Sequence, residues 1–434
     1  MTRSVEPSAP GGRVQAPASK SSMQRALACA AMARGTSTIT NPTWCEDSVA
    51  AMGVAQALGA GVERFDDRAV IRGGFRAPGG SAISVSCGES GLCLRMFSAI
   101  AALLSVDVEL RGEGSLATRP VGMVEAPLSS LGARCTTAGG FQPVHVRGPL
   151  LAGTVTVDGS ESSQFLTGLL LALPMAGEGR GGQRDSVVSV KDLVSRGYID
   201  MTLDVMRTFG AEVGRDDAFT EFRIRGGQPY LAADHEVEGD WSAAAFLLVA
   251  GAIAAAREPL EVVGLSPESS QPDRAILDAL LLAGARLEKL PGGWRVRSGP
   301  LRSFSFDATG CPDLFPPLVA LASRCSGVTE IRGASRLKAK ESDRAAALSG
   351  EFGKLGLEVG VEGDLLTVRG LGCDGGSPGG RLRGGSLSSR GDHRIAMAAA
   401  VATLAGSGPV SIEGADCVAK SWPGFFEALD SMLG

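Results

Sequence analysis

Hydrophobic and polar positions along this chain follow two periods, and the change from one to the other recurs at a nearly constant interval. Apolar residues at helical spacing run into an apolar-Gly-apolar triplet, and an alternating, strand-like pattern follows, as over 62–71 and 287–296. The glycines of successive triplets are 73, 78, 74 and 72 residues apart. The triplets are Leu58-Gly59-Ala60, Leu131-Gly132-Ala133, Phe209-Gly210-Ala211, Ala283-Gly284-Ala285 and Leu355-Gly356-Leu357.

Glycine is typical just after a helix end, because glycine alone enters the left-handed backbone region freely. Chance placement among 60 glycines is the alternative, and five occurrences at near-constant spacing argue against it. A last helix over 425–432 ends the chain where the next triplet would fall. We therefore predict an α/β (α+β) fold of six similar units, three in each of two domains, with a domain switch near 231–238.

Composition narrows the possible functions. A chain of 434 residues exceeds one ordinary core, which again favours two domains. The net charge of −5 argues against general nucleic-acid binding, which needs a basic face. Nine scattered cysteines and three histidines argue against a structural zinc site, and reduced thiols indicate a cytoplasmic protein. The longest apolar runs are too short to cross a membrane. Gly-rich stretches at 73–80, 177–182 and 370–385 are predicted surface loops.

The most informative charged stretch reads Lys340-Glu341-Ser342-Asp343-Arg344. If a helix includes it, Lys340 and Arg344 share one face at i,i+4 spacing. Two cations beside the Glu341 carboxylate could hold an anionic substrate while the carboxylate moves protons. Taken alone, a solvated charged helix start is the more common explanation. Other clusters of the same character favour the chemical interpretation.

Basic and hydroxyl residues recur where helices are expected to begin. Lys20 lies at the start of a helix that Ser19 or Ser21 can cap, a position that favours an anion rather than a cation. Asp313 precedes an apolar run and by base rates would be an ordinary N-cap. The hydroxyl and amide candidates are Ser162, Ser163, Gln164, Ser195 and Tyr198. The cations expected at helix starts are Lys20, Arg25, Arg119, Lys340, Arg344, Arg394 and Lys420. Together they predict a positive pocket inside an acidic protein.

These motifs resemble, in order and over about 12–426, the 5-enolpyruvylshikimate-3-phosphate synthase (3-phosphoshikimate 1-carboxyvinyltransferase) family. The motifs are Ser19-Lys20-Ser21, Arg119-Pro120, Ser162-Ser163-Gln164-Phe165-Leu166, Tyr198-Ile199-Asp200, Lys340-Glu341-Ser342-Asp343-Arg344 and Asp392-His393-Arg394. Singly, only the stretch from Lys340 to Arg344 is specific. As a set, the motifs are highly specific.

The resemblance implies two similar domains, each built from three β-α-β-α-β-β units and joined by a hinge, with the active site in the interdomain cleft. Residues 1–18 and 233–434 would form one domain and residues 19–232 the other. The implied reaction transfers the enolpyruvyl group of phosphoenolpyruvate to the 5-hydroxyl of shikimate-3-phosphate and releases phosphate. It belongs to the shikimate pathway of aromatic amino-acid biosynthesis, and the family is the target of glyphosate. The resemblance implies no metal or organic cofactor, and we expect a cytoplasmic monomer.

The resemblance also implies residue roles. Asp313 and Glu341 would be the catalytic carboxylates, with Lys20 close to both steps. Phosphoenolpyruvate would be bound by Lys20, Gly91, Arg119, Gln164, Arg344, His393, Arg394 and Lys420. Shikimate-3-phosphate would be bound by Lys20, Ser21, Arg25, Ser162, Ser163, Gln164, Ser195, Tyr198, Asp313 and Lys340. Glu89, Leu92 and Arg336 depart from the family pattern, which bears on substrate affinity and glyphosate sensitivity but not on the reaction class.

Two alternatives stay open at this point. UDP-N-acetylglucosamine enolpyruvyl transferase shares the fold and the chemistry. That family has Lys-Asn where this chain has Lys20-Ser21, and it carries a reactive loop cysteine, for which Cys135 in an expected strand is the nearest candidate. A non-catalytic relative that binds a phosphorylated metabolite is the second alternative, but it requires loss of a catalytic residue. A purely structural repeat protein would not need so many cations at helix starts.

Overall fold

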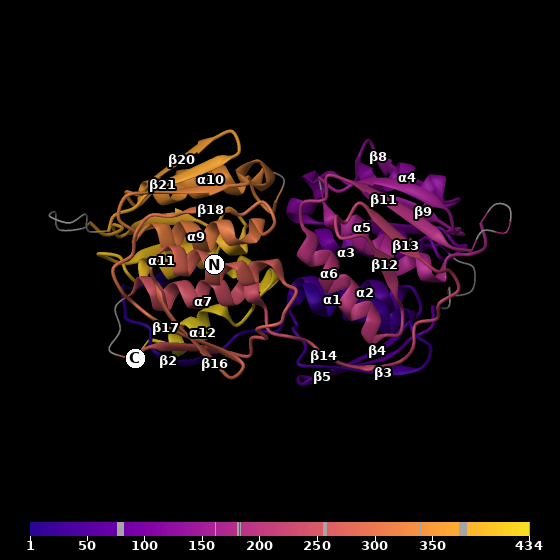
Figure 1. The fold of residues 1–434 in the computed structure, drawn as a ribbon, viewed down its shortest axis with the longest axis horizontal. Coiled ribbons are helices and arrows are strands. Elements are labelled where there is room, and N and C mark those ends of the chain that lie inside the picture. The colour runs from indigo at the N-terminus through magenta and orange to yellow at the C-terminus, as the bar shows by residue number, and fades with distance from the viewer. Residues whose placement is uncertain are drawn as a thin grey trace. The chain divides into compact units, whose positions relative to one another are not determined.

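The computed structural model describes residues 1–75, 82–160, 162–179, 182, 184–254, 258–338, 340–372 and 380–433. The chain divides into two compact units, and Figure 1 colours most of unit 1 orange to yellow and most of unit 2 indigo to magenta. Unit 1 is Met1–Pro17 with Glu238–Gly434, and unit 2 is Ala18–Val237. The chain returns to unit 1 after Val237, because β14 (Asp234–Glu236) pairs in parallel with β3 (Thr36–Thr40) of unit 2.

Each unit contains three similar repeats, which confirms the predicted six-unit fold. Within the described residues, the strands form six sheets, five of four strands and one of three. In the four-stranded sheets, the first strand of a repeat runs parallel to the second, and an antiparallel hairpin completes the sheet. An inner helix follows the first strand and an outer helix follows the second. The strand-like patterns over 62–71 and 287–296 are such hairpins, not the single strands expected, because each contains a short turn.

The repeats of unit 2 share this order of strands and helices. The first is β14, α1 (Lys20–Met32), β3, α2 (Glu46–Ala57), β4 (Gly61–Arg64) and β5 (Arg68–Arg72). The second is β6 (Ile83–Ser86), α3 (Gly91–Ala101), β7 (Val108–Arg111), α4 (Glu125–Ser130), β8 (Arg134–Ala138) and β9 (Phe141–Arg147). The third is β10 (Thr154–Asp158), α5 (Ser163–Ala172), β11 (Ser186–Lys191), α6 (Arg196–Thr208), β12 (Val213–Arg215) and β13 (Glu221–Ile224).

The repeats of unit 1 follow the same order, with one sheet shortened. The first is β2 (Gly12–Gln15), α7 (Trp241–Ile253), β15 (Leu260–Val263), α8 (Ile276–Leu282), β16 (Arg286–Leu290) and β17 (Gly293–Arg297). The second is β18 (Ser305–Asp307), α9 (Phe315–Ala322), β19 (Val328–Arg332), α10 (Arg344–Lys354), β20 (Glu358–Glu362) and β21 (Leu365–Arg369). The third is β22 (Gly385–Ser388), α11 (His393–Thr403), β23 (Val410–Glu413), α12 (Phe425–Ser431) and β1 (Thr2–Val5), which pairs with β23.

The first strands of two repeats are exchanged between the units. β2 precedes α1 in the chain but pairs with β15 of unit 1. β14 precedes α7 but pairs with β3 of unit 2. One sheet of each unit therefore takes its first strand from a distant part of the chain. The chain passes between the units twice.

The glycine triplets mark the ends of the outer helices, as predicted. All five glycines have a positive φ, between 78° and 106°. In each case the amide after the glycine donates to a carbonyl five residues earlier, as Ala60 does to Ala55 and Leu357 does to Phe352. This six-to-one bond satisfies a helix-end carbonyl that would otherwise have no intrahelical partner.

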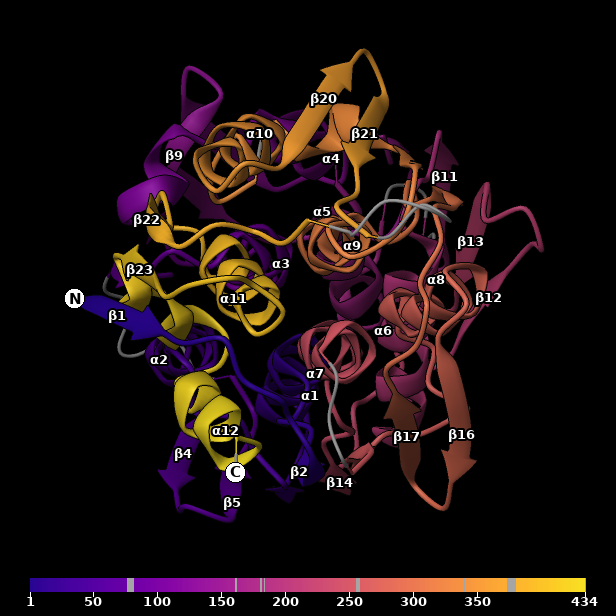
Figure 2. The same ribbon diagram turned by 90° about the vertical axis from the view of Figure 1, so that its left-hand side faces the viewer.

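The inner helices form the centre of each unit. Figure 2 shows α7, α9 and α11 of unit 1 end-on, with the sheets around them. Every residue of these three helices is buried, which explains why they are apolar on all sides. In unit 2, α1, α3 and α5 are almost as completely buried. The outer helices bury one face, as α6 does with Ile199, Leu203 and Met206.

Further expectations concern surface loops, membrane spans and thiols. Each Gly-rich stretch predicted as a surface loop includes residues outside the described part of the chain. Among the helices described, none is long and apolar enough to cross a membrane. The eight cysteines that the structure describes carry free thiols.

Candidate active site

The inner helices of unit 1 begin at one place, where their first residues contact one another. Arg394, at the start of α11, donates from Nη2 to Asp313 Oδ2 at 3.1 Å, just before α9. Its Nη1 donates to the hydroxyl of Ser242, at the start of α7. Helix N-termini carry partial positive charge, so this end of the unit favours anions even before the side chains are counted.

Arg344 is the centre of a buried ionic network in unit 1. Its side chain has no exposed surface, yet it contacts carboxylates from three segments. Nη1 lies 2.9 Å from Asp313 Oδ1, Nη2 lies 2.6 Å from Glu341 Oε2, and Nε lies 2.9 Å from Asp392 Oδ2. Burial opposes the charge on Arg344, but Asp392, Glu341 and Asp313 outweigh it and raise the pKa of the guanidinium. Arg344 therefore stays charged in a place closed to water.

Lys340 reaches the same network by a different route from the one expected. The prediction that Lys340 and Arg344 share a helix face was wrong, because α10 begins at Arg344. Asp343 caps the helix there by accepting from the amide of Ala346. Lys340 lies before the helix, and its Nζ is 3.6 Å from Asp313 Oδ1. Burial is the largest influence on Lys340 and lowers the pKa of its ammonium group to about 8.

Asp313 is the shared partner of these cations, not an ordinary helix cap. It lies in a short 3₁₀ turn (Pro312–Leu314), and no side chain caps α9. Burial alone would raise the pKa of its carboxyl group, but the charges of Arg394, Lys340 and Arg344 together hold it well below its usual range. Asp313 is therefore ionised throughout the physiological range.

His393 and Lys420 complete the unit 1 cluster. His393 is the first residue of α11 and is buried. Lys420 is the last residue of a 3₁₀ helix (Ala415–Lys420), so the expectation that it begins a helix was wrong. Its Nζ donates to the carbonyl of Gly391 at 2.9 Å, just before α11. The loop before α11 thus determines the position of both the Lys420 ammonium and the α11 residues.

In unit 2, Lys20 is the first residue of α1, as predicted, and Ser19 is its cap. A cation at this end of a helix was expected to need an anion. Asp47, in the first turn of α2, supplies one, with Oδ2 at 2.8 Å from Lys20 Nζ. Both side chains are largely buried. Asp47 was not predicted, since 27 residues separate it from its partner.

Arg25 joins three helices of unit 2. It is 2% exposed and donates to four neutral oxygens. Nε donates to Thr202 Oγ1 at 2.8 Å on α6, and Nη2 donates to Thr167 Oγ1 at 3.3 Å on α5. The other acceptors are the carbonyls of Ser21 and Tyr198. Burial lowers the pKa of Arg25 to about 10, so it remains a cation.

Gly91 lies where two guanidinium groups approach the chain. A β-carbon at this first residue of α3 would lie 2.8 Å from Arg95 Nη1 and 3.0 Å from Arg119 Nη1. Arg95 also donates to Gln164 Oε1 at 2.7 Å and to the Pro120 carbonyl at 2.8 Å. Glycine at this position lets both guanidinium groups lie against the backbone, and a larger residue would make them shift. Arg119 follows a 3₁₀ helix (Gly114–Thr118) and does not begin a helix as expected.

The hydroxyl candidates of unit 2 lie at the starts of α5 and α6. Ser162 caps α5 by accepting from the amide of Gln164, and Ser163 is the first helical residue. Ser195 is buried at the N-cap position of α6 and its side chain caps nothing. Tyr198 lies within the first turn of α6 and not before the helix. Glu89, which departs from the family pattern, accepts from the amide and hydroxyl of Ser115 at 2.8 and 2.7 Å.

Sequence reasoning missed the supporting residues Asp47, Arg95 and Asp392 as site members. Asp392 is fully buried, caps α11 through the amide of Arg394, and accepts from Arg344. A signal was present for this residue, since Asp392 immediately precedes His393-Arg394 at a helix start. No local signal marks Asp47 or Arg95, because their partners lie far away in the chain.

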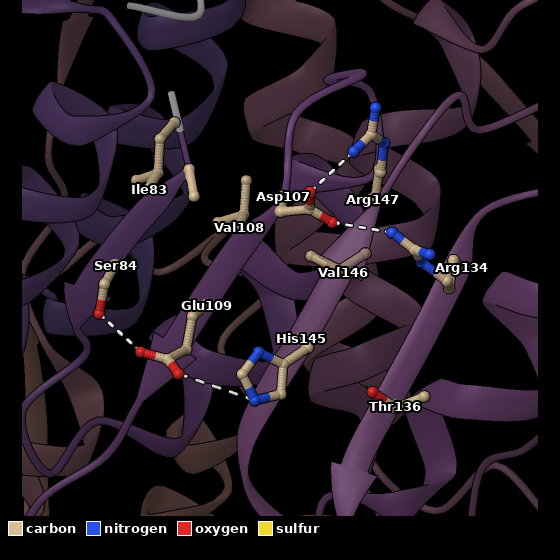
Figure 3. A pocket seen from close by; sticks show the side chains of 11 residues that line it. Ile83, Ser84, Asp107, Val108, Glu109, Arg134, Thr136, His145, Val146 and Arg147 are labelled. Carbon is tan, nitrogen blue, oxygen red and sulfur yellow. Dashed lines mark hydrogen bonds and ion pairs between the residues drawn. The ribbon is translucent and has the colours of Figure 1, made fainter. Parts of the chain in front are cut away.

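A separate hollow of about 270 Å³ on unit 2 provides a contrast, and none of the predicted site residues lines it. In Figure 3 its outward side chains pair with one another. Asp107 accepts from Arg134 at 2.9 Å and from Arg147 at 2.7 Å. Glu109 accepts from Ser84 at 2.7 Å. Most of these groups are well exposed, so the pairs are solvated surface pairs of the ordinary kind.

The two clusters can neutralise and orient a small, multiply charged anion. Each gathers cations and helix N-termini at one end of its unit, and unit 1 adds two carboxylates, Asp313 and Glu341, in contact with Arg344. Preorganised charges of this kind stabilise charge that develops during a reaction. Carboxylates beside them can exchange protons with a bound substrate.

Comparisons with known proteins agree over the whole length. The sequence model of the EPSP synthase (3-phosphoshikimate 1-carboxyvinyltransferase) family matches residues 6–429. A 3-phosphoshikimate 1-carboxyvinyltransferase from Aeropyrum pernix is 41% identical over 426 residues, covering 98% of this chain and 94% of the relative. One from Clostridium kluyveri is 37% identical, covering 99% and 97%. The solved structure of EPSP synthase from Acinetobacter baumannii has a TM-score of 0.83 at 26% identity, covering 100% of this chain and 98% of that one.

Proposed function

This chain belongs to the EPSP synthase (3-phosphoshikimate 1-carboxyvinyltransferase) family of enolpyruvyl transferases, and we propose that it transfers the enolpyruvyl group of phosphoenolpyruvate to the 5-hydroxyl of shikimate-3-phosphate. The hydroxyl gives up its proton to a base and its oxygen adds to C2 of phosphoenolpyruvate, while C3 gains a proton from an acid, which gives a tetrahedral intermediate. Loss of a proton from the C3 methyl group and of phosphate from C2 then forms the enol ether.

The observation that carries the proposal is the buried network around Arg344. A fully buried guanidinium in contact with Asp313, Glu341 and Asp392 is costly to desolvate. Buried charges whose pKa values are as strongly shifted as those of Arg344 and Asp313 cluster at functional sites. We propose that Arg344, Arg394, His393 and Lys420 bind phosphoenolpyruvate, together with Lys20, Gly91, Arg119 and Gln164 of unit 2.

The same proposal assigns shikimate-3-phosphate to neutral donors and a few cations. In unit 2 these are Lys20, Ser21, Arg25, Ser162, Ser163, Gln164, Ser195 and Tyr198, and in unit 1 they are Asp313 and Lys340. Asp313, held ionised by three cations, suits the role of accepting a hydrogen bond from the substrate hydroxyl. When substrate anions bind those cations, less positive charge remains for Asp313, and its basicity rises as the reaction requires.

Glu341 is the second proposed catalytic carboxylate. Its Oε2 contacts Arg344 Nη2 at 2.6 Å and its side chain is partly accessible, so it can reach a bound substrate. Lys20, which is paired with Asp47, would neutralise negative charge on the phosphate group as it leaves. Proton transfer by positioned groups of this kind contributes about 10²- to 10⁴-fold to a rate.

A nucleotide-sugar substrate is disfavoured by the state of Cys135. This residue lies in β8 and is buried, as the sequence indicated. Burial, with a smaller effect of Glu125, raises the pKa of its thiol to about 12. A thiol with so high a pKa is a poor nucleophile at neutral pH.

The experiment that tests the proposal is phosphate release by the purified protein, with each substrate omitted in turn. We expect release that requires both phosphoenolpyruvate and shikimate-3-phosphate. Release with UDP-N-acetylglucosamine in place of shikimate-3-phosphate would instead assign the chain to the related cell-wall reaction. If no phosphate is released with either acceptor, the result would favour a relative that binds its ligand without catalysis, and it would overturn the proposal.

A further inference from the structure

A buried carboxylate on α10, Glu351, contacts the turn formed by residues 388–391, which leads into α11. Glu351 has no exposed surface. Its Oε2 accepts from the backbone amide of Ser388 at 2.8 Å, and its Oε1 accepts from Nε and Nη2 of Arg390 at 2.8 Å. Lys354, one turn further along α10, donates to Oε2 at 2.6 Å. Two of the three partners of Glu351 therefore belong to the turn.

The same helix also holds the far end of the turn. Arg344 lies seven residues before Glu351, which is two helical turns, so both side chains project from one face of α10. Arg344 contacts Asp392, the residue just after the turn, at 2.9 Å. One face of α10 thus anchors residues 388–391 at the beginning through Glu351 and at the end through Arg344.

The turn needs such anchoring because of its backbone. Arg390 has φ of 53° and Gly391 has φ of 70°. A left-handed conformation is unusual for an arginine and persists where surrounding contacts enforce it. The contact of two Arg390 nitrogens with Glu351 Oε1 is one such contact, and the hydrogen bond from the Ser388 amide is another.

This turn determines where two proposed phosphoenolpyruvate ligands lie. The carbonyl of Gly391 accepts from Lys420 Nζ at 2.9 Å. Arg394 is the second residue of α11, and the side chain of Asp392, just before the helix, accepts from the Arg394 amide at 3.0 Å. A shift of the turn would move both the Lys420 ammonium and the Arg394 guanidinium.

We propose that Glu351 is a positioning residue for phosphoenolpyruvate binding, acting through residues 388–391 on Arg394 and Lys420. This rests on the proposed function. Burial opposes ionisation of Glu351, but Lys354, the Ser388 amide and Arg390 lower the pKa of its carboxyl group, so it acts as a carboxylate. Its negative charge is what fixes Arg390 and thereby the left-handed backbone.

The test is Glu351→Gln, which keeps the size of the side chain and removes its charge. We expect the KM for phosphoenolpyruvate to rise about tenfold, with kcat and the KM for shikimate-3-phosphate changed less than about twofold, because binding contacts shared by ground and transition states affect KM alone. Glu358→Gln is the matched control, since it makes the same change in an exposed carboxylate that pairs with Arg369 and not with the turn. It should leave all three constants unchanged.

Arg390→Gly keeps the experiment informative if Glu351→Gln folds poorly. It removes a half-exposed side chain from the turn while allowing the same positive φ. We expect it to raise the KM for phosphoenolpyruvate about threefold. Hydrogen exchange provides a second measurement, in which amides of 388–394 should exchange faster in Glu351→Gln and not in Glu358→Gln.

Two results would overturn the inference while leaving the proposed function intact. One is faster exchange in the turn with an unchanged KM for phosphoenolpyruvate. The other is a loss of kcat and of the binding of both substrates by similar factors. That result would mean that Glu351 supports the fold in general and not phosphoenolpyruvate binding in particular. If the unmodified protein releases no phosphate, the proposed function fails first and the inference fails with it.

Discussion

Each unit has an arginine that is almost fully buried, Arg344 in unit 1 and Arg25 in unit 2, and these two arginines are held in different ways. In unit 1, Arg344 contacts three carboxylates and Arg394 and Lys340 share one of them, Asp313. In unit 2, Arg25 donates to two hydroxyls and two backbone carbonyls. Both arginines are almost fully buried, so the difference lies in the partners and not in the exposure.

This difference separates two ways of building a positive site. Neutral oxygens fix Arg25 in place and leave its full charge available. Carboxylates neutralise Arg344 and its neighbours until another anion arrives, and they also supply groups that can move protons. We infer that unit 2 mainly positions substrate, whereas unit 1 mainly provides the reactive charges.

The largest expected effect comes from Glu341→Gln, which removes a proposed proton-transfer group from unit 1. We expect kcat to fall about 10²- to 10⁴-fold while shikimate-3-phosphate still binds. Steady-state kinetics and calorimetry measure the two quantities. Glu362→Gln, at an exposed position on β20, is the matched control and should be silent. Full turnover in Glu341→Gln would remove Glu341 from the mechanism.

Asp392→Asn tests, through protein stability, how strongly the carboxylates of unit 1 hold Arg344. Arg344 keeps Asp313 and Glu341, but the change removes the carboxylate that pairs with its Nε in a buried place, at a cost of about 3–5 kcal/mol. The urea concentration at the unfolding midpoint of unit 1 should fall accordingly. The fluorescence of three tryptophans of unit 1, Trp241, Trp294 and Trp422, measures this midpoint. A change below about 1 kcal/mol would show that Glu341 and Asp313 alone compensate Arg344.

Lys340 provides a pH test. Its ammonium group has a pKa of about 8, so it is charged below that pH and becomes neutral above it. If its charge binds shikimate-3-phosphate, kcat/KM should decline by about tenfold per pH unit above pH 8. Lys340→Arg keeps the charge and should keep the profile level to about pH 9. The same decline in both proteins would assign the titration to another group.

The smallest effect is expected in unit 2, from Thr202→Val. This change removes the acceptor for Arg25 Nε and leaves the other three hydrogen bonds described for Arg25 in place. We expect a loss of about 2 kcal/mol of unfolding free energy, less than for Asp392→Asn. Thermal unfolding measures both. If Thr202→Val loses as much unfolding free energy as Asp392→Asn or more, neutral partners stabilise a buried arginine as strongly as carboxylates do, and the distinction between the two units fails.

The sequence was sufficient for the repeats, because their signals are local. A glycine five times in the same place after a helix predicts the same backbone each time, and Ser19 before Lys20 predicts the start of α1. The Lys340–Arg344 pairing failed for a local reason too. Asp343 followed by Arg344 and three alanines is a helix-start signal, and it places Lys340 outside the helix.

What the sequence could not provide are the partners of the charges. Arg344 and Asp392 are 48 residues apart, and Arg25 and Thr202 are 177 apart. Their contacts depend on how buried helices pack, which no local pattern specifies. The place of β14 was missed for a similar reason, since pairing with β3 across the chain decides to which unit those residues belong.

Asp313 has a consequence for selectivity among anions. It is a counterion attached to the same chain as its cations, so its local concentration around them is far higher than that of any free salt ion. Chloride must compete with it one charge at a time and gains little from a single contact. An anion that carries several charges in the right arrangement can replace Asp313 on two or three cations at once. We therefore expect Asp313 to stay paired with the cations in ordinary salt and to be displaced from them only by ligands of high charge.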